Sequence, residues 1–178
     1  MNVQMTFDLA ALNRIVSGIG NDIGDSVRPA AQAGIQVIYD QVKANVRRIG
    51  RKTGNLEKSI YQAFSDKRSI DKKRATYAVG WNKKTAPHGG LIEFGHIQRY
   101  VVYVGKDGKF YAAKQRGAKG KKPSRKASQA VKDAYYVPLP NGPRQVAARP
   151  FLRPALQRLP DAESAIRRKI LERVNGNT

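Results

Sequence analysis

The side chains whose types could do chemistry gather in one short run of the chain. His88 and His96 flank Glu93 within His88-Gly89-Gly90-Leu91-Ile92-Glu93-Phe94-Gly95-His96. If this run is helical, the two imidazoles lie about 12 Å apart along the axis, too far to share one tetrahedral metal ion without a fold back. No third ligand stands at a metal-binding spacing. We therefore expect neither a metal site nor a cofactor here.

Glu93 stands among the apolar residues Leu91, Ile92 and Phe94, which predicts a partly buried carboxylate. A buried carboxylate needs a cation or backbone donors as partners. Arg149 or Arg153 is the natural choice, because a guanidinium pairs with a carboxylate through two parallel hydrogen bonds. This reasoning gives Glu93 a structural role rather than a catalytic one.

Other arrangements that would indicate an enzyme are missing from the sequence. The spacing of Gly18, Gly20 and Gly24 does not fit a dinucleotide-binding loop, and Gly117-x-x-Gly120-Lys121-Lys122 lacks the length and the hydroxyl residue of a P-loop. There is no cysteine, no cluster of carboxylates, and no arrangement of Ser, His and Asp that indicates nucleophilic catalysis. The sequence predicts a protein that is not an enzyme.

The elements that position these residues begin with a long helix predicted over residues 27–49. Ser26 is its expected N-cap, with Pro29 in the first turn. Its apolar stripe recurs at steps of three and four and consists of Val27, Ala31, Ile35, Ile38, Val42, Val46 and Ile49.

Alternating apolar residues predict strands at 3–7 and at 77–81. Further strands are expected at 60–64, 100–104, 110–111 and 135–139, with Asp107-Gly108 as a hairpin turn. Helices are expected at 9–16, at 87–94, at 151–159 and from Asp161 onward, with Pro160 ending or kinking the third of these. The fold class is therefore α+β: a small antiparallel sheet packed against one long helix, with a C-terminal helix. Residues 1–178 are expected to form a single domain.

A strong positive charge is the main compositional feature of the chain. It has 34 Lys and Arg residues against 13 acidic ones, a formal net charge of +21. A long, flexible, basic hairpin arm is expected at about residues 112–132, where Gly, Pro and like charges disfavour regular structure. This arm could contact DNA phosphates, dock on an acidic neighbouring subunit, or remain a solvated loop. Its basic residues are Lys114, Arg116, Lys119, Lys121, Lys122, Arg125 and Lys126.

Ala148-Arg149-Pro150-Phe151-Leu152-Arg153-Pro154-Ala155-Leu156 combines prolines with bulky apolar residues. The simplest interpretation is a loop that enters a helix, with Phe151 and Leu152 in the core and the prolines fixing the approach. The arginines could instead face a subunit interface, where Arg is enriched.

Three motifs in order carry a resemblance to a known family: Thr53-Gly54-Asn55-Leu56-Glu57-Lys58-Ser59-Ile60, then the run that contains Glu93, then the Arg149 to Leu156 run. Together they resemble the neck, tail-completion, head–tail connector and minor tail proteins of tailed bacteriophages. The matching positions, which the resemblance marks as fold and interface residues, are Gly54, Asn55, Leu56, Ser59, Ile60, Gly89, Glu93, Phe94, Gly95, Arg149, Pro150, Phe151, Leu152, Arg153 and Pro154.

The resemblance implies a non-enzymatic structural protein of the virion, at the neck or tail on the path of the DNA, assembled in the host cytoplasm. Its implied partners are further copies in a ring, adjacent connector, head-completion or tail-tube proteins and, non-specifically, genomic DNA. No membrane partner is expected. The alternative is a basic nucleic-acid-binding protein, such as a ribosome-associated or DNA-packaging factor, which the charge alone would also fit.

Overall fold

The computed structural model describes residues 3–8, 22–50, 53–107 and 110–175. The chain divides into two compact units, residues 1–93 together with 149–178, and residues 94–148. The helix expected at residues 9–16 lies outside the described residues. No helix in the described ranges is long and apolar enough to span a bilayer.

The first unit is organised around helix α2 (Asp22–Ile49). The predicted apolar stripe is confirmed, because its members from Val27 to Val46 are all buried. The start was predicted wrongly: the helix begins at Asp22, so Ser26 is a buried helical residue and Pro29 lies beyond the first turn. Apolar spacing records which side chains face a core, whereas the first turn depends on backbone hydrogen bonds that this spacing does not encode.

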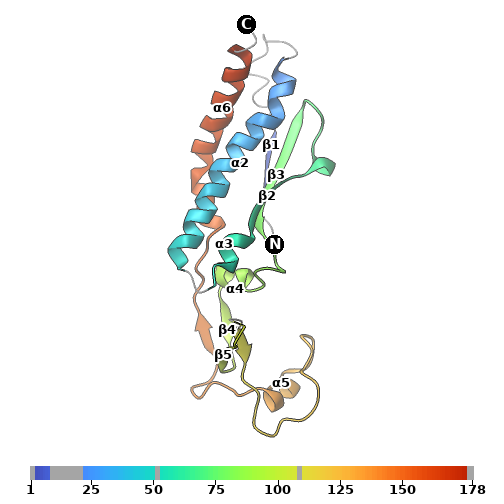
Figure 1. The fold of residues 1–178 in the computed structure, drawn as a ribbon, viewed down its shortest axis with the longest axis vertical. Helices are drawn as coiled ribbons and strands as arrows, with labels where there is room; N and C mark the ends of the chain where they lie inside the picture. The colour runs from blue at the N-terminus through green and yellow to red at the C-terminus, as the bar shows by residue number, and fades with distance from the viewer. Residues whose placement is uncertain (1–2, 9–21, 51–52, 108–109, 176–178) are drawn as a thin grey trace. The chain divides into compact units, whose positions relative to one another are not determined.

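One side of α2 packs on a three-stranded antiparallel sheet of order β1-β3-β2 (Figure 1). The strands are β1 (Val3–Asp8), β2 (Ile60–Phe64) and β3 (Arg74–Trp81), and Val3 pairs with Val79 while Ile60 pairs with Trp81. The predicted strand is confirmed, and Tyr77, Val79 and Trp81 are buried in the core. The expected alternation of burial is not, because Thr76 and Gly80 between them are buried as well in this central strand. The short elements α3 (Asn55–Ser59), η1 (Asp66–Arg68) and α4 (Gly89–Phe94) flank these strands in the chain.

Helix α6 (Leu159–Asn175) packs along α2, and Figure 1 shows α2 between α6 and the sheet. The two helices approach closely at Gly34, where an added Cβ atom would lie 2.7 Å from Ile166 Cγ1. The helix expected at 151–159 is a 3-10 helix, η2 (Arg153–Arg158), with Pro154 at its start. This 3-10 helix ends at Arg158, just before Pro160, and Pro160 itself is the second residue of α6, where its missing N–H has no helical acceptor.

The second unit contains two antiparallel strand pairs and one short helix. Strand β4 (His96–Gln98) pairs with β7 (Arg144–Val146), and β5 (Val102–Val104) pairs with β6 (Phe110–Ala112). The expected strand at 135–139 is wrong at its beginning, because Tyr135 ends helix α5 (Gln129–Tyr135), and Tyr136 and Pro138 make single bridges only. Helices with small antiparallel sheets confirm the predicted α+β class.

Candidate functional site

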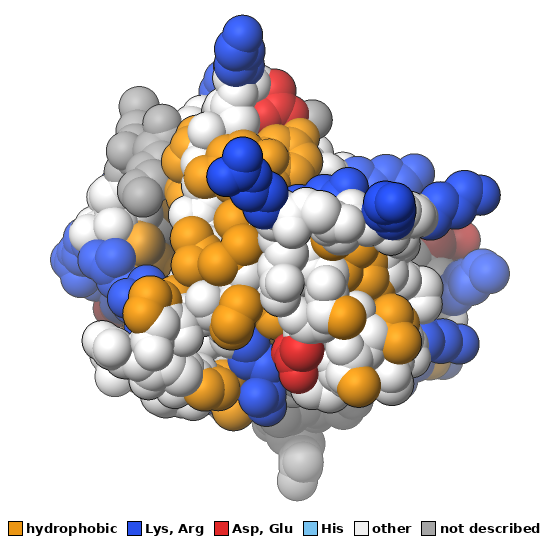
Figure 2. Space-filling model, turned by 90° about the horizontal axis from the view of Figure 1, so that it is seen from below, with side chains coloured by type: hydrophobic (Ala, Val, Ile, Leu, Met, Phe, Trp, Pro, Cys, Tyr) orange, Lys and Arg blue, Asp and Glu red, His pale blue; other side chains and the backbone are white. Residues whose placement is uncertain are grey.

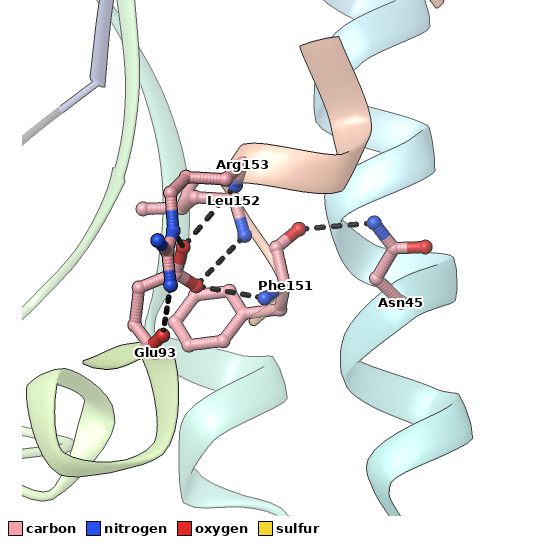
Figure 3. A network of polar contacts seen from close by, with 5 residues as sticks. All are labelled: Asn45, Glu93, Phe151, Leu152 and Arg153. Carbon is pink, nitrogen blue, oxygen red and sulfur yellow. Dashed lines mark hydrogen bonds and ion pairs between the residues drawn. The ribbon is translucent and has the colours of Figure 1, made fainter. Parts of the chain in front are cut away.

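The carboxylate of Glu93 forms the centre of a buried polar network with Asn45, Phe151, Leu152 and Arg153, which we call the Glu93 network (Figure 3). Glu93 lies on α4 with 1 % of its surface exposed. Its Oε2 atom accepts hydrogen bonds from the backbone N–H groups of Phe151, at 2.7 Å, and Leu152, at 3.0 Å. Its Oε1 atom accepts from the backbone N–H and the Nε of Arg153, both at 3.2 Å.

The backbone donors belong to Leu152, the N-cap of η2, to Arg153, its first residue, and to Phe151 just before them. The first amides of a helix have no acceptor within it and carry a partial positive charge, so a carboxylate there is stabilised. Most helices take this acceptor from a residue next to them in the chain. Here Glu93 supplies it from 58 residues away. The interaction therefore joins two segments that are distant in the sequence.

The contact also runs in the opposite direction. Arg153 Nη2 donates to the carbonyl oxygen of Glu93 at 2.8 Å. The backbone N–H of Arg149 donates to the carbonyl oxygen of Ile92, also at 2.8 Å. The last carbonyl groups of a helix have no N–H donor within it, and here Arg149 and Arg153 supply donors to two carbonyl groups in the last turn of α4. Each element satisfies the free backbone groups of the other.

Helix α2 and the apolar core hold the Phe151 side of the network. Asn45 Nδ2 donates to the Phe151 carbonyl at 3.0 Å, and Gln41 Nε2 in turn donates to Asn45 Oδ1 at 2.9 Å. The Phe151 ring is fully buried and meets Trp81 edge to face, with 5.7 Å between ring centroids. Gly89 lies against the same indole, because an added Cβ atom would be 2.4 Å from Trp81 Nε1.

The predicted pairing of Glu93 with an arginine is confirmed, and the partner is Arg153. The Arg149 side chain is exposed, and only its backbone joins α4. Sequence reasoning did not identify the three backbone donors, although Pro150 and Pro154 mark the turn that aims them. A carboxylate that is buried and accepts four hydrogen bonds has no free oxygen for a substrate proton, so this arrangement stabilises the fold rather than reacting.

The two histidines lie in different compact units. Burial lowers the pKa of His88 below its ordinary value of 6.5. His96 Nδ1 is buried and has no hydrogen-bond partner among the described residues. In the described ranges, no three His, Asp or Glu side chains are grouped as metal ligands would be.

The first motif shapes the connection between α2 and β2. Gly54 precedes α3 with a φ of 73°, in the left-handed region, and Asn55 is the first residue of this helix. Leu56, Ser59 and Ile60 are buried, and the Ser59 hydroxyl donates to the Leu56 carbonyl at 2.7 Å.

Phe94 and Gly95 lie just after the Glu93 network. The Phe94 side chain is 47 % exposed. Gly95 has a φ of 71°, and a Cβ atom there would lie 2.6 Å from the Val146 carbonyl oxygen. Gly95 therefore meets both requirements that favour glycine, left-handed backbone and a close approach of another chain segment.

All seven basic side chains between Lys114 and Lys126 are exposed. The ends of the expected arm at 112–132 are structured: Lys114 forms a bridge with Tyr136, and its ammonium lies 5.3 Å from the Tyr135 ring centroid. Residues 129–132 belong to α5, which begins after Ser128, whose Oγ accepts from the Val131 N–H at 3.4 Å. Ser128 is an N-cap residue and could have indicated this helix, but the run of basic residues favoured a flexible arm instead.

Charge is concentrated in the second unit, where residues 94–148 hold 12 Lys and Arg residues and only two acidic ones, Asp107 and Asp133. Tyr111 donates to Asp107 at 2.6 Å, and Tyr100 donates to Asp133 at 2.7 Å. The bond from Tyr100 lowers the pKa of Asp133, with a second contribution from Gln129. Figure 2 shows Lys and Arg side chains interspersed with hydrophobic ones and few acidic ones on the face drawn.

Comparison with known proteins matches part of the chain to a family model. Residues 10–95 match the family model described as "Bacteriophage HK97-gp10, putative tail-component". No curated protein and no solved structure matches the chain. The family match confirms the resemblance to tailed-bacteriophage structural proteins. It ends just after Glu93, and the Glu93 network joins this segment to the Arg149 to Leu156 run outside it.

Proposed function

We propose that the protein is a non-enzymatic structural component of a tailed-bacteriophage virion. It forms part of the neck or head–tail junction, as a tail-completion or connector ring of identical copies around the DNA path. It is assembled in the host cytoplasm and then carried in the virion. The family match at residues 10–95 is the observation that carries this proposal.

The geometry around Glu93 supports a structural role. The most conspicuous buried carboxylate of the described chain is fully engaged by four donors, and its exposed fraction is 1 %. The motif residues Gly54, Gly89, Gly95 and Phe151 occupy turns and close contacts within the fold. These four residues, which carry part of the family resemblance, thus serve the fold.

The exposed side chains of the chain contact its partners. In the proposed ring the partners are neighbouring copies, adjacent connector, head-completion or tail-tube proteins and, non-specifically, the genome. The net charge of +21 supports at least one polyanionic or acidic neighbour, because such a charge repels itself.

Interrupting the gene in the phage and imaging the particles by negative-stain electron microscopy tests this function. The proposal predicts filled heads and separate tails, or tails with an incomplete end, and restoration of whole particles by the gene supplied in trans. Normal numbers of joined, infectious particles from the interrupted phage would refute it.

A second candidate is a basic nucleic-acid-binding protein that acts outside the virion. The observation that favours it is the charge of residues 94–148, which include 12 basic residues and only two acidic ones. It predicts tight binding to bare DNA or RNA, with an affinity that falls steeply with salt. Gel-shift titrations at two salt concentrations test it, and weak binding at the lower one excludes it.

A further inference from the structure

The strand pair β5–β6, which we call the apolar ribbon, exposes hydrophobic side chains on both of its faces. Tyr103 pairs with Tyr111 on one face. Val102 pairs with Ala112 and Val104 with Phe110 on the other. Side chains alternate between faces along a strand, so neither face of the apolar ribbon is a polar one. A two-stranded ribbon by itself is only marginally stable in water.

Most hydrophobic side chains of the apolar ribbon stay largely exposed among the described residues of its own unit. The exposed fractions are 42 % for Val102, 54 % for Tyr103 and 57 % for Val104. None of the described residues between 94 and 148 is buried, so this unit has no hydrophobic core into which the ribbon could fold. Contiguous apolar surface of this kind marks an interaction site.

The charge next to the apolar ribbon restricts the identity of the partner. Lys106 follows β5, and Lys114 stands two residues after β6, both with exposed side chains. Residues 94–148 carry a net charge of +10, so the same unit of a second copy would be repelled. Duplex DNA would satisfy the charge through its phosphates, but it would leave Val102 and Val104 in water.

An acidic protein surface with an apolar centre satisfies both features. Interfaces commonly bury an apolar centre within a polar rim, and opposite charges on the two rims orient the partners. We propose that the apolar ribbon, with the basic residues beside it, docks on such a surface of a different virion protein. This inference rests on the proposed function and deepens it, and contacts between copies in the ring then use other surfaces.

Site-specific photocrosslinking in assembled particles tests the inference. Tyr103 is replaced by p-benzoylphenylalanine in the full chain, the particles are purified and irradiated, and the crosslinked peptides are identified by mass spectrometry. A crosslink to another virion protein, in a segment of net negative charge, supports the inference. A crosslink to a second copy or to DNA, or no crosslink in particles that contain the chain, overturns it. Particles without the chain reject the proposed function itself.

Two variants provide the quantitative test, in which the affinity of each for the protein identified by crosslinking is measured. Val102→Thr with Val104→Thr keeps β-branched side chains in β5 while it adds hydroxyls to the docking face. The matched control is Leu171→Thr on α6, at a position as exposed as Val104 (57 %). We expect at least a tenfold weaker affinity for the ribbon variant, unchanged affinity for the control and similar circular dichroism spectra for both. Equal affinities in the two variants would overturn the inference.

Discussion

Glu93 Oε2 accepts the backbone N–H of Phe151 at 2.7 Å, although 58 residues separate the two in the chain. This hydrogen bond connects the last turn of α4 with the start of η2, within the first compact unit. It places the Phe151 ring against Trp81 in the core. The strength of this connection can be measured through substitutions at either end.

Glu93→Gln should lower the free energy of unfolding by about 3 kcal/mol, because the backbone N–H groups and Arg153 lose their anionic acceptor in a buried site. Urea unfolding followed by the fluorescence of Trp81, the only tryptophan, provides the measurement. The matched control is Glu163→Gln, at an exposed position on α6, with an expected change below about 0.5 kcal/mol. Equal stabilities of the two variants would contradict this account.

Arg153→Ala should cost much less, about 1 kcal/mol, because the Arg153 side chain is 54 % exposed and its ion pair is screened by solvent. Glu93 then keeps its three backbone donors. The same urea experiment gives the order wild type, Arg153→Ala, Glu93→Gln in decreasing stability. A larger loss for Arg153→Ala than for Glu93→Gln would show that the arginine, and not the backbone, carries the network.

Gly34→Ala should destabilise the contact between α2 and α6 by about 1–3 kcal/mol, since the new Cβ atom overlaps Ile166. The control is Gly90→Ala in α4, where the nearest atom would lie at an ordinary 3.7 Å. Combining Gly34→Ala with Ile166→Ala should cost less than the sum of the two single changes, because the second removes the overlapping atoms. Strict additivity would argue against this close approach.

His88 should make stability depend on pH between about pH 7 and pH 5.5, where most carboxylates stay ionised. Burial lowers its pKa in the folded state below 6.5, so the unfolded chain binds more protons in this window. Stability therefore rises with pH and falls as His88 is protonated. His88→Gln should flatten this slope in urea titrations at several pH values, and an unchanged slope would contradict the assignment.

Ser128→Ala should loosen α5 by about 1 kcal/mol, because the Val131 N–H loses its capping acceptor. Hydrogen exchange should become faster at α5 amides and stay unchanged in α2. Ser124→Ala, also exposed but outside the helix, is the control. Faster exchange in the control alone would contradict the capping role.

The sequence allowed the prediction of elements whose periodicity the core imposes. The apolar residues of the stripe from Val27 to Val46 are buried as expected, and so are Tyr77, Val79 and Trp81 in β3. Starts of helices were predicted less well, because backbone hydrogen bonds rather than apolar spacing determine them. Helix α2 begins at Asp22 and α6 at Leu159, both earlier than expected.

The candidate site was predicted in part. Burial of Glu93 among apolar neighbours indicated an arginine partner, which is Arg153. The backbone donors depend on the local turn at Phe151 and Leu152, which residue types alone do not specify. Exposure of Val102 and Val104 was also unpredictable, because an apolar β-type run normally indicates a buried strand.

Cryo-electron microscopy of purified particles tests most directly whether the chain is a structural part of the virion. The account predicts density for several symmetry-related copies of this fold at the neck or tail end, with the Glu93 side chain enclosed by the turn at Phe151. Complete particles whose every neck and tail density is explained by other chains would contradict it.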